Sequence, residues 1–435
     1  MADPARLAAY DVVRAVRTQD AYANLVLPRA LRDHRLSGRD AGFATELAAG
    51  TLRRQGTYDA VIDACLARGK VKPRIRDVLR LGTHQLLGMR VGGHAAVSTT
   101  VDLARARTGA GSVGLVNAVL RTVSEHDLET WIERVAPDPL TDPVGHLAIA
   151  HSHPRWVVEE LGRALGPRDH ELPDLLAADN EAPGVVLVAR PGRSTREELP
   201  GEPTTLSPYG VRLAGGDPGA VPAIAEGRAG VQDEGSQLVA LALAAAPIMG
   251  EDARWLDLCA GPGGKAALLA AMGAERGAHL VANEPQAHRA DLVRRAVGAA
   301  GNVEVTEVDG REPPWPPGSF DRVLVDAPCS GLGALRRRPE ARWRKQPADI
   351  KELVPLQQSL LSSALDLTRP GGVVVYATCS PVIAETTEVV DAVVGGRHDV
   401  EPAPPTRQLW PHEHGTDAMF WATLRRRWGQ RGPHR

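Results

Sequence analysis

Between residues 254 and 377 the sequence alternates short apolar runs with helical segments, and this alternation constrains the fold more than any other feature. Strands that alternate with helices favour parallel β-α-β units. We therefore expect an α/β domain with a doubly wound parallel sheet, whose chemistry lies at the carboxyl ends of the strands. The expected strands are Trp255–Cys259, His279–Asn283, Val303–Val308, Phe320–Val325 and Val373–Ala377.

A glycine-rich turn follows the first of these strands. Residues 256–265 read Leu-Asp-Leu-Cys-Ala-Gly-Pro-Gly-Gly-Lys, and glycines let a backbone turn tightly and approach a ligand closely. Glu284 ends the second strand, where it can accept hydrogen bonds from ribose hydroxyls, and Asp309 after the third could receive an adenine amino group. The turn lacks the spacing of a dinucleotide fingerprint and the ending of a P-loop. S-adenosylmethionine fits it better than NAD or ATP.

Two cysteines follow the last two expected strands. Cys329 lies in Asp-Ala-Pro-Cys-Ser-Gly and Cys379 in Tyr-Ala-Thr-Cys-Ser. A thiolate beside S-adenosylmethionine suits methylation of an unreactive ring carbon, because its addition to C6 of cytosine makes C5 nucleophilic. Such a thiolate needs an electropositive or hydrogen-bonded setting. We interpret the other two cysteines, Cys65 and Cys259, as packing residues.

The N-terminal third is expected to be helical and carries excess positive charge. Residues 75–89 and 116–123 each place apolar side chains on one helix face. Residues 1–124 hold 19 basic and 10 acidic side chains, although the whole chain has a formal net charge of −2. This asymmetry suggests an anionic partner such as nucleic acid, but arginines on solvated helix faces would give the same count. The basic tail from Arg425 to Arg435 is either an RNA contact or a disordered end.

Several classes of protein are disfavoured. No segment approaches the roughly 20 apolar residues that cross a bilayer, and the N-terminus shows no signal core, so a cytoplasmic location is expected. The cysteines form no CxxC motif. His151 with His153 and His412 with His414 lack partners at zinc spacing, so no metal is expected.

Three segments together resemble the signature motifs of the RNA cytosine-5 methyltransferases of the Nol1/Nop/Sun family. They are residues 257–265, 325–333 and 376–380. Residues 231–237, and residues 335–340 with Trp343, resemble further segments of that family. The N-terminus, through residues 94–98 and 115–121, is similar to a NusB-type RNA-binding domain, a pairing found in the Sun (Fmu) branch. The resemblance spans nearly the whole chain.

This resemblance implies three regions and one reaction. An all-α NusB-like RNA-binding domain would span 1–136, a linker with a small α+β region 137–230, and a Rossmann-like, S-adenosylmethionine-dependent methyltransferase domain 231–435. The reaction would be methylation of cytosine C5 in 16S ribosomal RNA by a monomer. Ala266, residues 383–386 and residues 417–421 depart from the family pattern, which leaves details of the target pocket open.

The resemblance also implies a role for each site residue. Cys379 would attack C6, and Cys329 would assist release of the product by helping C5 to lose its proton; DNA cytosine methyltransferases use a Pro-Cys cysteine, so the reverse assignment stays open. Lys265 would lie near the reacting centre, and Asp326 would touch the target base. The cofactor site would comprise Cys259, Ala260, Gly261, Pro262, Gly263, Gly264, Lys265, Glu284, Asp309 and Asp326.

Two other functions would also account for parts of the sequence. The chain could be a NusB-like RNA-binding scaffold with a non-catalytic methyltransferase domain, but a scaffold has no need of Cys379, Cys329 and Asp326 together. An NAD-dependent oxidoreductase is disfavoured by the spacing of the glycine turn and has no use for two thiols.

Overall fold

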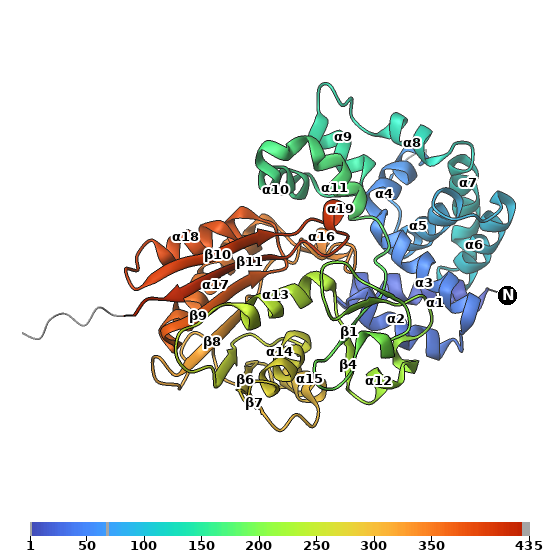
Figure 1. The fold of residues 1–435 in the computed structure, drawn as a ribbon. Helices are drawn as coiled ribbons and strands as arrows, with labels where there is room; N and C mark the ends of the chain where they lie inside the picture. Colours follow the sequence, from blue (N-terminus) through green and yellow to red (C-terminus); the bar gives the residue numbers. More distant parts are fainter. Residues whose placement is uncertain (1, 67–68, 429–435) are drawn as a thin grey trace, which may run out of the picture. The chain divides into compact units, whose positions relative to one another are not determined.

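The computed structural model describes residues 2–66 and 69–428 (Figure 1). The chain forms two compact units. The helical unit comprises residues 1–182 and 335–345, and the sheet unit comprises residues 183–334 and 346–435. This division does not follow the three regions expected from the sequence. Residues 429–435 of the basic tail lie outside the described residues.

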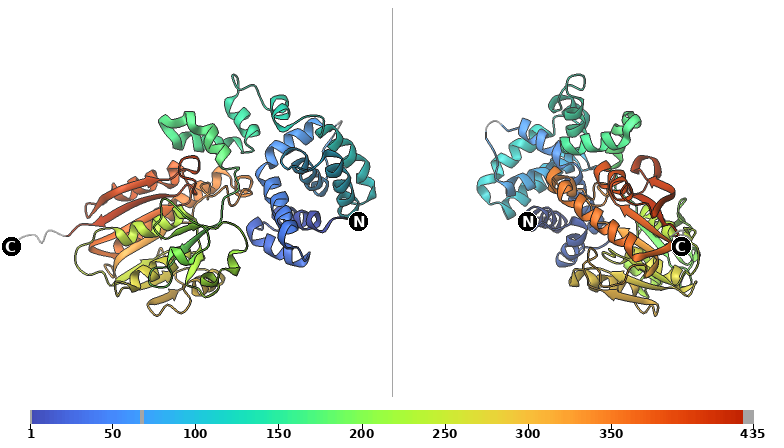
Figure 2. Two further views of the ribbon diagram at one scale, coloured as in Figure 1. Left: turned by 45° about the vertical axis from the view of Figure 1, so that its right-hand side comes forward. Right: turned by 90° about the vertical axis from the view of Figure 1, so that its left-hand side faces the viewer.

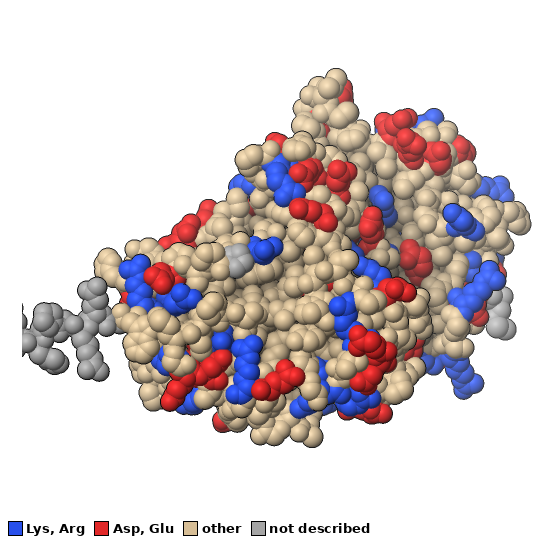
Figure 3. Space-filling model, viewed as in Figure 1, with Lys and Arg blue, Asp and Glu red and all other residues tan. Residues whose placement is uncertain are grey.

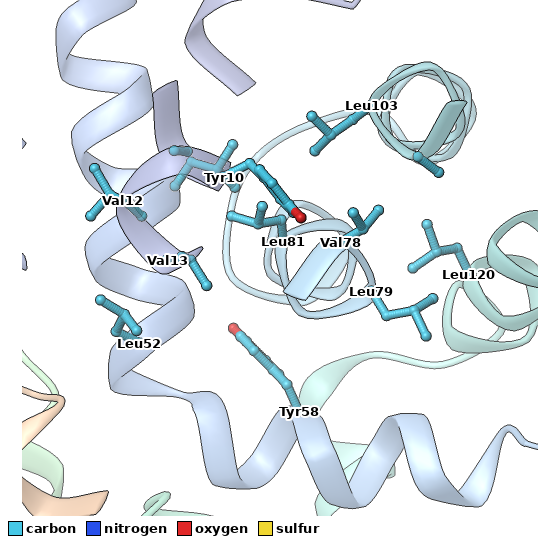
Figure 4. Close-up of a cluster of buried hydrophobic side chains, with 14 of the residues drawn as sticks. Tyr10, Val12, Val13, Leu52, Tyr58, Val78, Leu79, Leu81, Leu103 and Leu120 are labelled. Atoms are coloured by element: carbon cyan, nitrogen blue, oxygen red, sulfur yellow. The ribbon is translucent and has the colours of Figure 1, made fainter. Parts of the chain in front are cut away.

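The helical unit packs around one apolar core. Tyr58, Val78, Leu79 and Leu120 are among its fully buried side chains (Figure 4). The helix expected over residues 75–89 is present, although it ends at Leu87. The helices are α1 (Pro4–Thr18), α2 (Ala23–Asp33), α3 (Gly38–Arg53), α4 (Gln55–Ala64), α5 (Pro73–Leu87), α6 (Gly93–Arg107), α7 (Val113–Val123), α8 (Leu128–Val135), α9 (Pro143–Ala150), α10 (Arg155–Leu165), α11 (Leu172–Ala178) and α16 (Ala341–Arg344).

Residues 137–182 belong to the helical unit, because residues of this segment accept hydrogen bonds from the start of α4. The Gly56 amide donates to Ser152 Oγ at 2.8 Å, and Thr57 Oγ1 donates to the Ile149 carbonyl at 2.5 Å. The Pro- and Asp-rich stretch 137–143 therefore joins two helices of one unit, α8 and α9.

A second segment, residues 335–345, joins the helical unit from far along the chain. The Arg342 side chain is fully buried there. Its guanidinium donates to the carbonyls of Ser152 (3.0 Å) and Asp179 (3.1 Å) and to Asn180 Oδ1 (2.9 Å). Burial lowers the pKa of Arg342 to about 10, which still leaves it charged at neutral pH. The segment is thus an internal part of the helical unit.

The described residues of the sheet unit form a seven-stranded sheet with the order β10-β11-β9-β8-β5-β6-β7. All five expected strands are present and run parallel, and two antiparallel strands extend the sheet beyond β9. The doubly wound α/β prediction is confirmed. The strands are β5 (Arg254–Asp257), β6 (His279–Asn283), β7 (Val303–Thr306), β8 (Phe320–Asp326), β9 (Thr368–Thr378), β10 (Val400–Gln408) and β11 (Phe420–Arg426).

Helices cover both faces of this sheet (Figure 2). α13 (Glu234–Ala245), α14 (Gly264–Ala274) and α15 (Ala287–Val297) pack on one face around Trp255. α17 (Pro347–Leu367) and α18 (Thr387–Val394) pack on the other around Val323 and Val325. The unit is completed by α12 (Pro222–Ala225), α19 (Pro411–His414) and a small antiparallel sheet of order β2-β3-β1-β4, formed by β1 (Val186–Ala189), β2 (Glu202–Pro203), β3 (Gly210–Arg212) and β4 (Ala229–Val231).

An apolar groove of about 760 Å³ runs between α13 and the strands β10 and β11. Leu238, Leu241, Pro402 and Trp421 are among its lining residues. Figure 3 shows mainly uncharged side chains over α13. No helix in the described part of the chain is both long and apolar enough to cross a membrane.

Candidate active site

The ends of the parallel strands bring the expected site residues to one edge of the sheet. Asp257 ends β5 and Asp326 ends β8. Asp257 pairs with Leu324, and Asp326 pairs with Ala377 near the end of β9. Because these neighbouring strands run parallel, their carboxyl ends lie together. Cys329 and Cys379 follow directly in the loops after β8 and β9.

Cys329 and Cys379 form a thiol pair, with 3.4 Å between their sulfur atoms. The backbone fixes the two loops against each other, since the Gly333 amide donates to the Cys379 carbonyl at 2.9 Å. A Cβ atom at Gly333 would lie 2.9 Å from that carbonyl oxygen and closer still to the Ala418 carbonyl oxygen. Glycine at this position therefore permits the close approach of the two loops.

Lys265 supplies a buried positive charge beside the thiol pair. Its ammonium donates to Asp326 Oδ2 at 2.8 Å, and its side chain is only 12% exposed. Burial alone would favour the neutral amine, but the charge and hydrogen bond of Asp326 outweigh it and raise the pKa of Lys265. The residue is therefore a fixed cation.

The charges around the thiol pair make its two sulfurs unequal. The hydrogen bond from the Cys329 thiol lowers the pKa of Cys379 against the opposing effect of burial, and Lys265 lowers it further. The same hydrogen bond, burial and the nearby Glu385 raise the pKa of Cys329. Cys379 is consequently the more acidic thiol of the pair.

The glycine turn after β5 takes a backbone conformation that requires glycine and packs closely against α15. Gly263 has φ +94°, and a Cβ there would lie 2.7 Å from Ala296 Cβ, so only glycine fits. Gly261 also has a positive φ, of +56°. Pro262 lies between them, and Gly264 begins α14. At the other side of the turn, the Ala260 amide donates to the Asn283 carbonyl at 2.8 Å.

Asp257 was not among the site residues expected from the sequence, although it lies in the same motif. It is fully buried, and neither of its carboxyl oxygens has a hydrogen-bond partner among the residues that the structure describes. Burial and the nearby Asp326 raise its pKa to about 7. An unpartnered buried carboxyl at the glycine turn suits a ligand that brings a hydrogen-bond donor or a positive charge.

Glu284 and Asp309 lie in different surroundings. Glu284 follows β6, is nearly buried and accepts a hydrogen bond from the Gln286 amide at 3.1 Å. Asp309 lies three residues beyond the end of β7, where the exposed Arg311 donates to it and lowers its pKa to about 2. Cys259 is partly buried, and burial raises its pKa well above the ordinary value.

Two further residues of this region carried no recognisable signal in the sequence. Asn283, at the end of β6, donates to the carbonyls of Leu258 (3.1 Å) and Val308 (3.0 Å), so it ties the ends of three strands together. Glu385 is fully buried and bonds to the loops of both cysteines; in the sequence it appears only within a departure from the family pattern. Within residues 2–66 and 69–428, no group of three or more His, Cys, Asp or Glu side chains could hold a metal.

Comparison with known proteins places this fold and site in a class. The family model of the 16S rRNA methyltransferases RsmB/F matches residues 244–425, and that of the NusB family matches residues 3–125. Together with the full-length relatives described next, these matches show that the chain belongs to the RsmB/F family of rRNA methyltransferases. The family resemblance drawn from the motifs is confirmed, and so is the cofactor class, since the family is dependent on S-adenosylmethionine.

Full-length relatives agree with this assignment. Rv1407 of Mycobacterium tuberculosis (strain ATCC 25618 / H37Rv), which bears the name of a methyltransferase, is 53% identical over 98% of this chain and 97% of its own. "Ribosomal RNA small subunit methyltransferase B" of Pseudomonas syringae pv. tomato is 33% identical over 96% of each chain.

Solved structures share the fold at lower identity. The crystal structure of PH0851 superposes with a TM-score of 0.80 at 22% identity and covers 98% of this chain and 99% of its own. NSun6 from Pyrococcus horikoshii gives a TM-score of 0.53 at 16% identity and covers 63% of this chain and 98% of its own. At these identities, the two structures show that this chain shares their fold and nothing more.

Proposed function

We propose that this protein methylates C5 of a cytosine in 16S ribosomal RNA through a covalent bond between Cys379 and C6. The observation that carries the proposal is the thiol pair itself, with 3.4 Å between the sulfurs, where the hydrogen bond with Cys329 and then the charge of Lys265 lower the pKa of Cys379. A buried lysine and carboxylate beside two thiols is a costly arrangement that packing alone does not require. Because its substrate would be rRNA, we place the reaction in the cytoplasm. We also propose that the protein acts as a monomer, since a single chain holds every residue that the mechanism uses.

The cofactor site fits S-adenosylmethionine. Gly261 and Gly263, with their positive φ, shape the turn that would hold it, Glu284 can accept hydrogen bonds from its ribose, and Asp309 can receive its adenine amino group. The unpartnered carboxyl of Asp257 is suited to its ammonium group. When bound, S-adenosylmethionine supplies an electrophilic methyl group to the activated C5.

The first step is addition of Cys379 to the base. The thiolate forms a bond to C6, and the π electrons of the C5–C6 bond become available at C5. The hydrogen bond with Cys329 and the charge of Lys265 favour the ionised form of the sulfur before this step. The cytosine has to leave its stack, since C6 can be attacked only from the face of the ring.

Release of the product is assigned to Cys329. Its hydrogen bond to the Cys379 sulfur is the largest cause of the high pKa of Cys329. Once the Cys379 sulfur is bonded to carbon, it is no longer a charged acceptor, so Cys329 can lose its proton to solvent. The resulting thiolate takes the proton from C5, the C5–C6 double bond re-forms, and Cys379 leaves as a thiolate. The Cys329 thiol then again donates to Cys379.

We also propose that the helical unit binds RNA. A hollow of about 610 Å³ in this unit is lined by five cationic side chains. Three of them, Arg14, Lys72 and Arg74, are exposed and form no ion pair with another described residue. Free cations around a hollow can contact successive phosphates of a nucleic acid backbone. The other two are Arg17 and Arg107.

The deciding experiment is incubation of the protein with labelled S-adenosylmethionine and unmethylated 16S rRNA, both naked and assembled into small subunits, followed by nucleoside analysis. Formation of 5-methylcytidine is the expected result. Binding of RNA without any 5-methylcytidine would instead favour the scaffold, and methylation at another ring atom would remove the need for the thiol pair.

A further inference from the structure

One carboxyl group joins the two loops that carry the thiol pair. Glu385 Oε1 accepts from the Ser330 amide at 2.7 Å, and Oε2 accepts from Ser330 Oγ at 2.5 Å and from Ser380 Oγ at 2.7 Å. Ser330 directly follows Cys329, and Ser380 directly follows Cys379. The side chain of Glu385 therefore links the residues next to both sulfurs.

The surroundings hold Glu385 itself in place. Gln357 Nε2, from α17, donates to Glu385 Oε1 at 3.1 Å and to the Pro328 carbonyl at 2.8 Å. The Tyr376 hydroxyl donates to the Glu385 carbonyl at 2.7 Å. All these donors are neutral, and no described Lys, Arg or His forms an ion pair with Glu385. Burying a carboxylate among neutral donors costs stability. A contribution to folding stability therefore does not explain why a glutamate lies here.

We infer that Glu385 is a positioning residue for the methyl transfer, holding the loops of Cys329 and Cys379 so that the two sulfurs stay in contact. This inference rests on the covalent mechanism proposed above. It assigns Glu385 no contact with the RNA or with the cofactor. Displacing reacting groups by about 1 Å can reduce a rate about 10²-fold, so a residue that fixes the distance between the sulfurs has a large effect on turnover.

The charge of Glu385 adds an electrostatic effect to this geometric one. After Cys379 and burial, Glu385 is a further cause of the raised pKa of Cys329. The carboxylate thereby favours the arrangement in which Cys329 keeps its proton and donates it to Cys379. Its removal has a measurable consequence that general destabilisation would not produce.

The first test compares Glu385→Gln with Glu388→Gln in the full-length protein. Glu388 is exposed on α18, three residues further along, and its variant should behave as wild type. Glu385→Gln keeps the size of the side chain but loses acceptors, so we expect kcat to fall about 10²-fold with KM unchanged for RNA and for S-adenosylmethionine. An unchanged kcat would overturn the inference.

The second test needs no RNA and so stands apart from the proposed function. In a Cys379→Ser background, iodoacetamide alkylation of Cys329 is followed against pH by peptide mass spectrometry. Adding Glu385→Gln removes a negative charge, so alkylation of Cys329 should begin at lower pH, whereas adding Glu388→Gln should leave the profile in place. A profile that does not move, with a lowered melting temperature, would assign Glu385 a purely structural role.

A milder variant covers the case in which Glu385→Gln does not fold. Ser380→Ala removes a single donor to Glu385 and should lower kcat less, again without changing KM. If the wild-type protein forms no 5-methylcytidine, the proposed reaction is wrong, while the alkylation profiles still decide whether Glu385 acts on the thiol pair.

Discussion

The sheet unit and the helical unit use positive charge in opposite ways. In the sheet unit, Lys265 is buried and paired with Asp326 at 2.8 Å, next to two thiols. In the helical unit, Arg14, Lys72 and Arg74 surround an open hollow without carboxylate partners among the described residues. Buried charges act strongly at short range, whereas exposed ones act over about 10 Å and are screened by salt.

This difference separates two tasks. Tuning a thiol requires a fixed cation in a low dielectric, where one charge shifts a pKa. Holding a polyanion requires several free cations that tolerate many backbone positions. We therefore expect substitutions in the sheet unit to change turnover and its pH dependence, and substitutions around the hollow to change affinity and its salt dependence.

The largest effect is expected from the thiol pair. Cys379→Ser should reduce turnover by at least about 10³-fold, because a nucleophile has no substitute in a covalent mechanism. Cys329→Ser should still form the bond to C6 but release it slowly, so a protein–RNA adduct should persist on a denaturing gel. The reverse pattern, with an adduct in Cys379→Ser alone, would exchange the two roles.

A stability measurement tests Asp257. With a pKa raised to about 7 in the folded state, the carboxyl stays protonated between about pH 4 and pH 7 while the unfolded chain ionises. The unfolded state then binds fewer protons, so stability falls as pH rises. Wild type should lose about 2–3 kcal/mol of unfolding free energy between about pH 5 and pH 8 from this group, measured by urea denaturation.

The matching variant is Asp257→Asn, which cannot ionise. It should lose less stability than wild type over the same pH range and should bind S-adenosylmethionine more weakly by calorimetry. Parallel pH curves for the two proteins would show that Asp257 is not the group responsible.

Lys265→Met should have an intermediate effect. Without the ammonium, the pKa of Cys379 rises, and a pKa that is higher by one leaves about tenfold less thiolate at any pH below it. The pH profile of Cys379 alkylation by iodoacetamide should therefore move to higher pH. Lys351→Met, on the exposed surface of α17, is the control and should leave the profile where it was.

The smallest effect is expected at the hollow. Combined Arg14→Ala, Lys72→Ala and Arg74→Ala should weaken RNA binding several-fold and reduce the slope of log affinity against log salt by about 2, with kcat unchanged. The control combines Arg32→Ala, Arg35→Ala and Arg39→Ala, which are exposed but do not line the hollow. Equal losses in both variants would mean that net charge alone is responsible.

The sheet unit was largely predictable because its strands are short apolar runs that end in polar motifs. Periodicity located all five parallel strands and thus the positions of Cys329, Cys379 and Asp326. The antiparallel strands β10 and β11 were missed, since prolines such as Pro402 and Pro404 interrupt the apolar pattern of β10. Edge strands tolerate proline because one side of their backbone makes no ladder bonds.

Other features depend on contacts between residues far apart in the sequence. No sequence pattern near Glu385 indicates that its carboxyl accepts a hydrogen bond from Ser330, 55 residues away. Likewise, nothing in the basic stretch at 335–340 indicates that Arg342, just beyond it, is fully buried. Pattern reasoning detects which elements form, but a buried polar network is defined only once those elements pack.

The position of Arg342 also sets an order of events during protein synthesis. Residues 1–182 emerge from the ribosome first, yet the carbonyls of Ser152 and Asp179 receive their guanidinium only when Arg342 follows. At roughly 5–20 residues per second, these roughly 160 residues delay completion of the N-terminal unit by about 8–30 s. The nascent chain thus carries an unfinished first unit while its second is being translated, and a transcript truncated before codon 342 would leave that unit permanently incomplete.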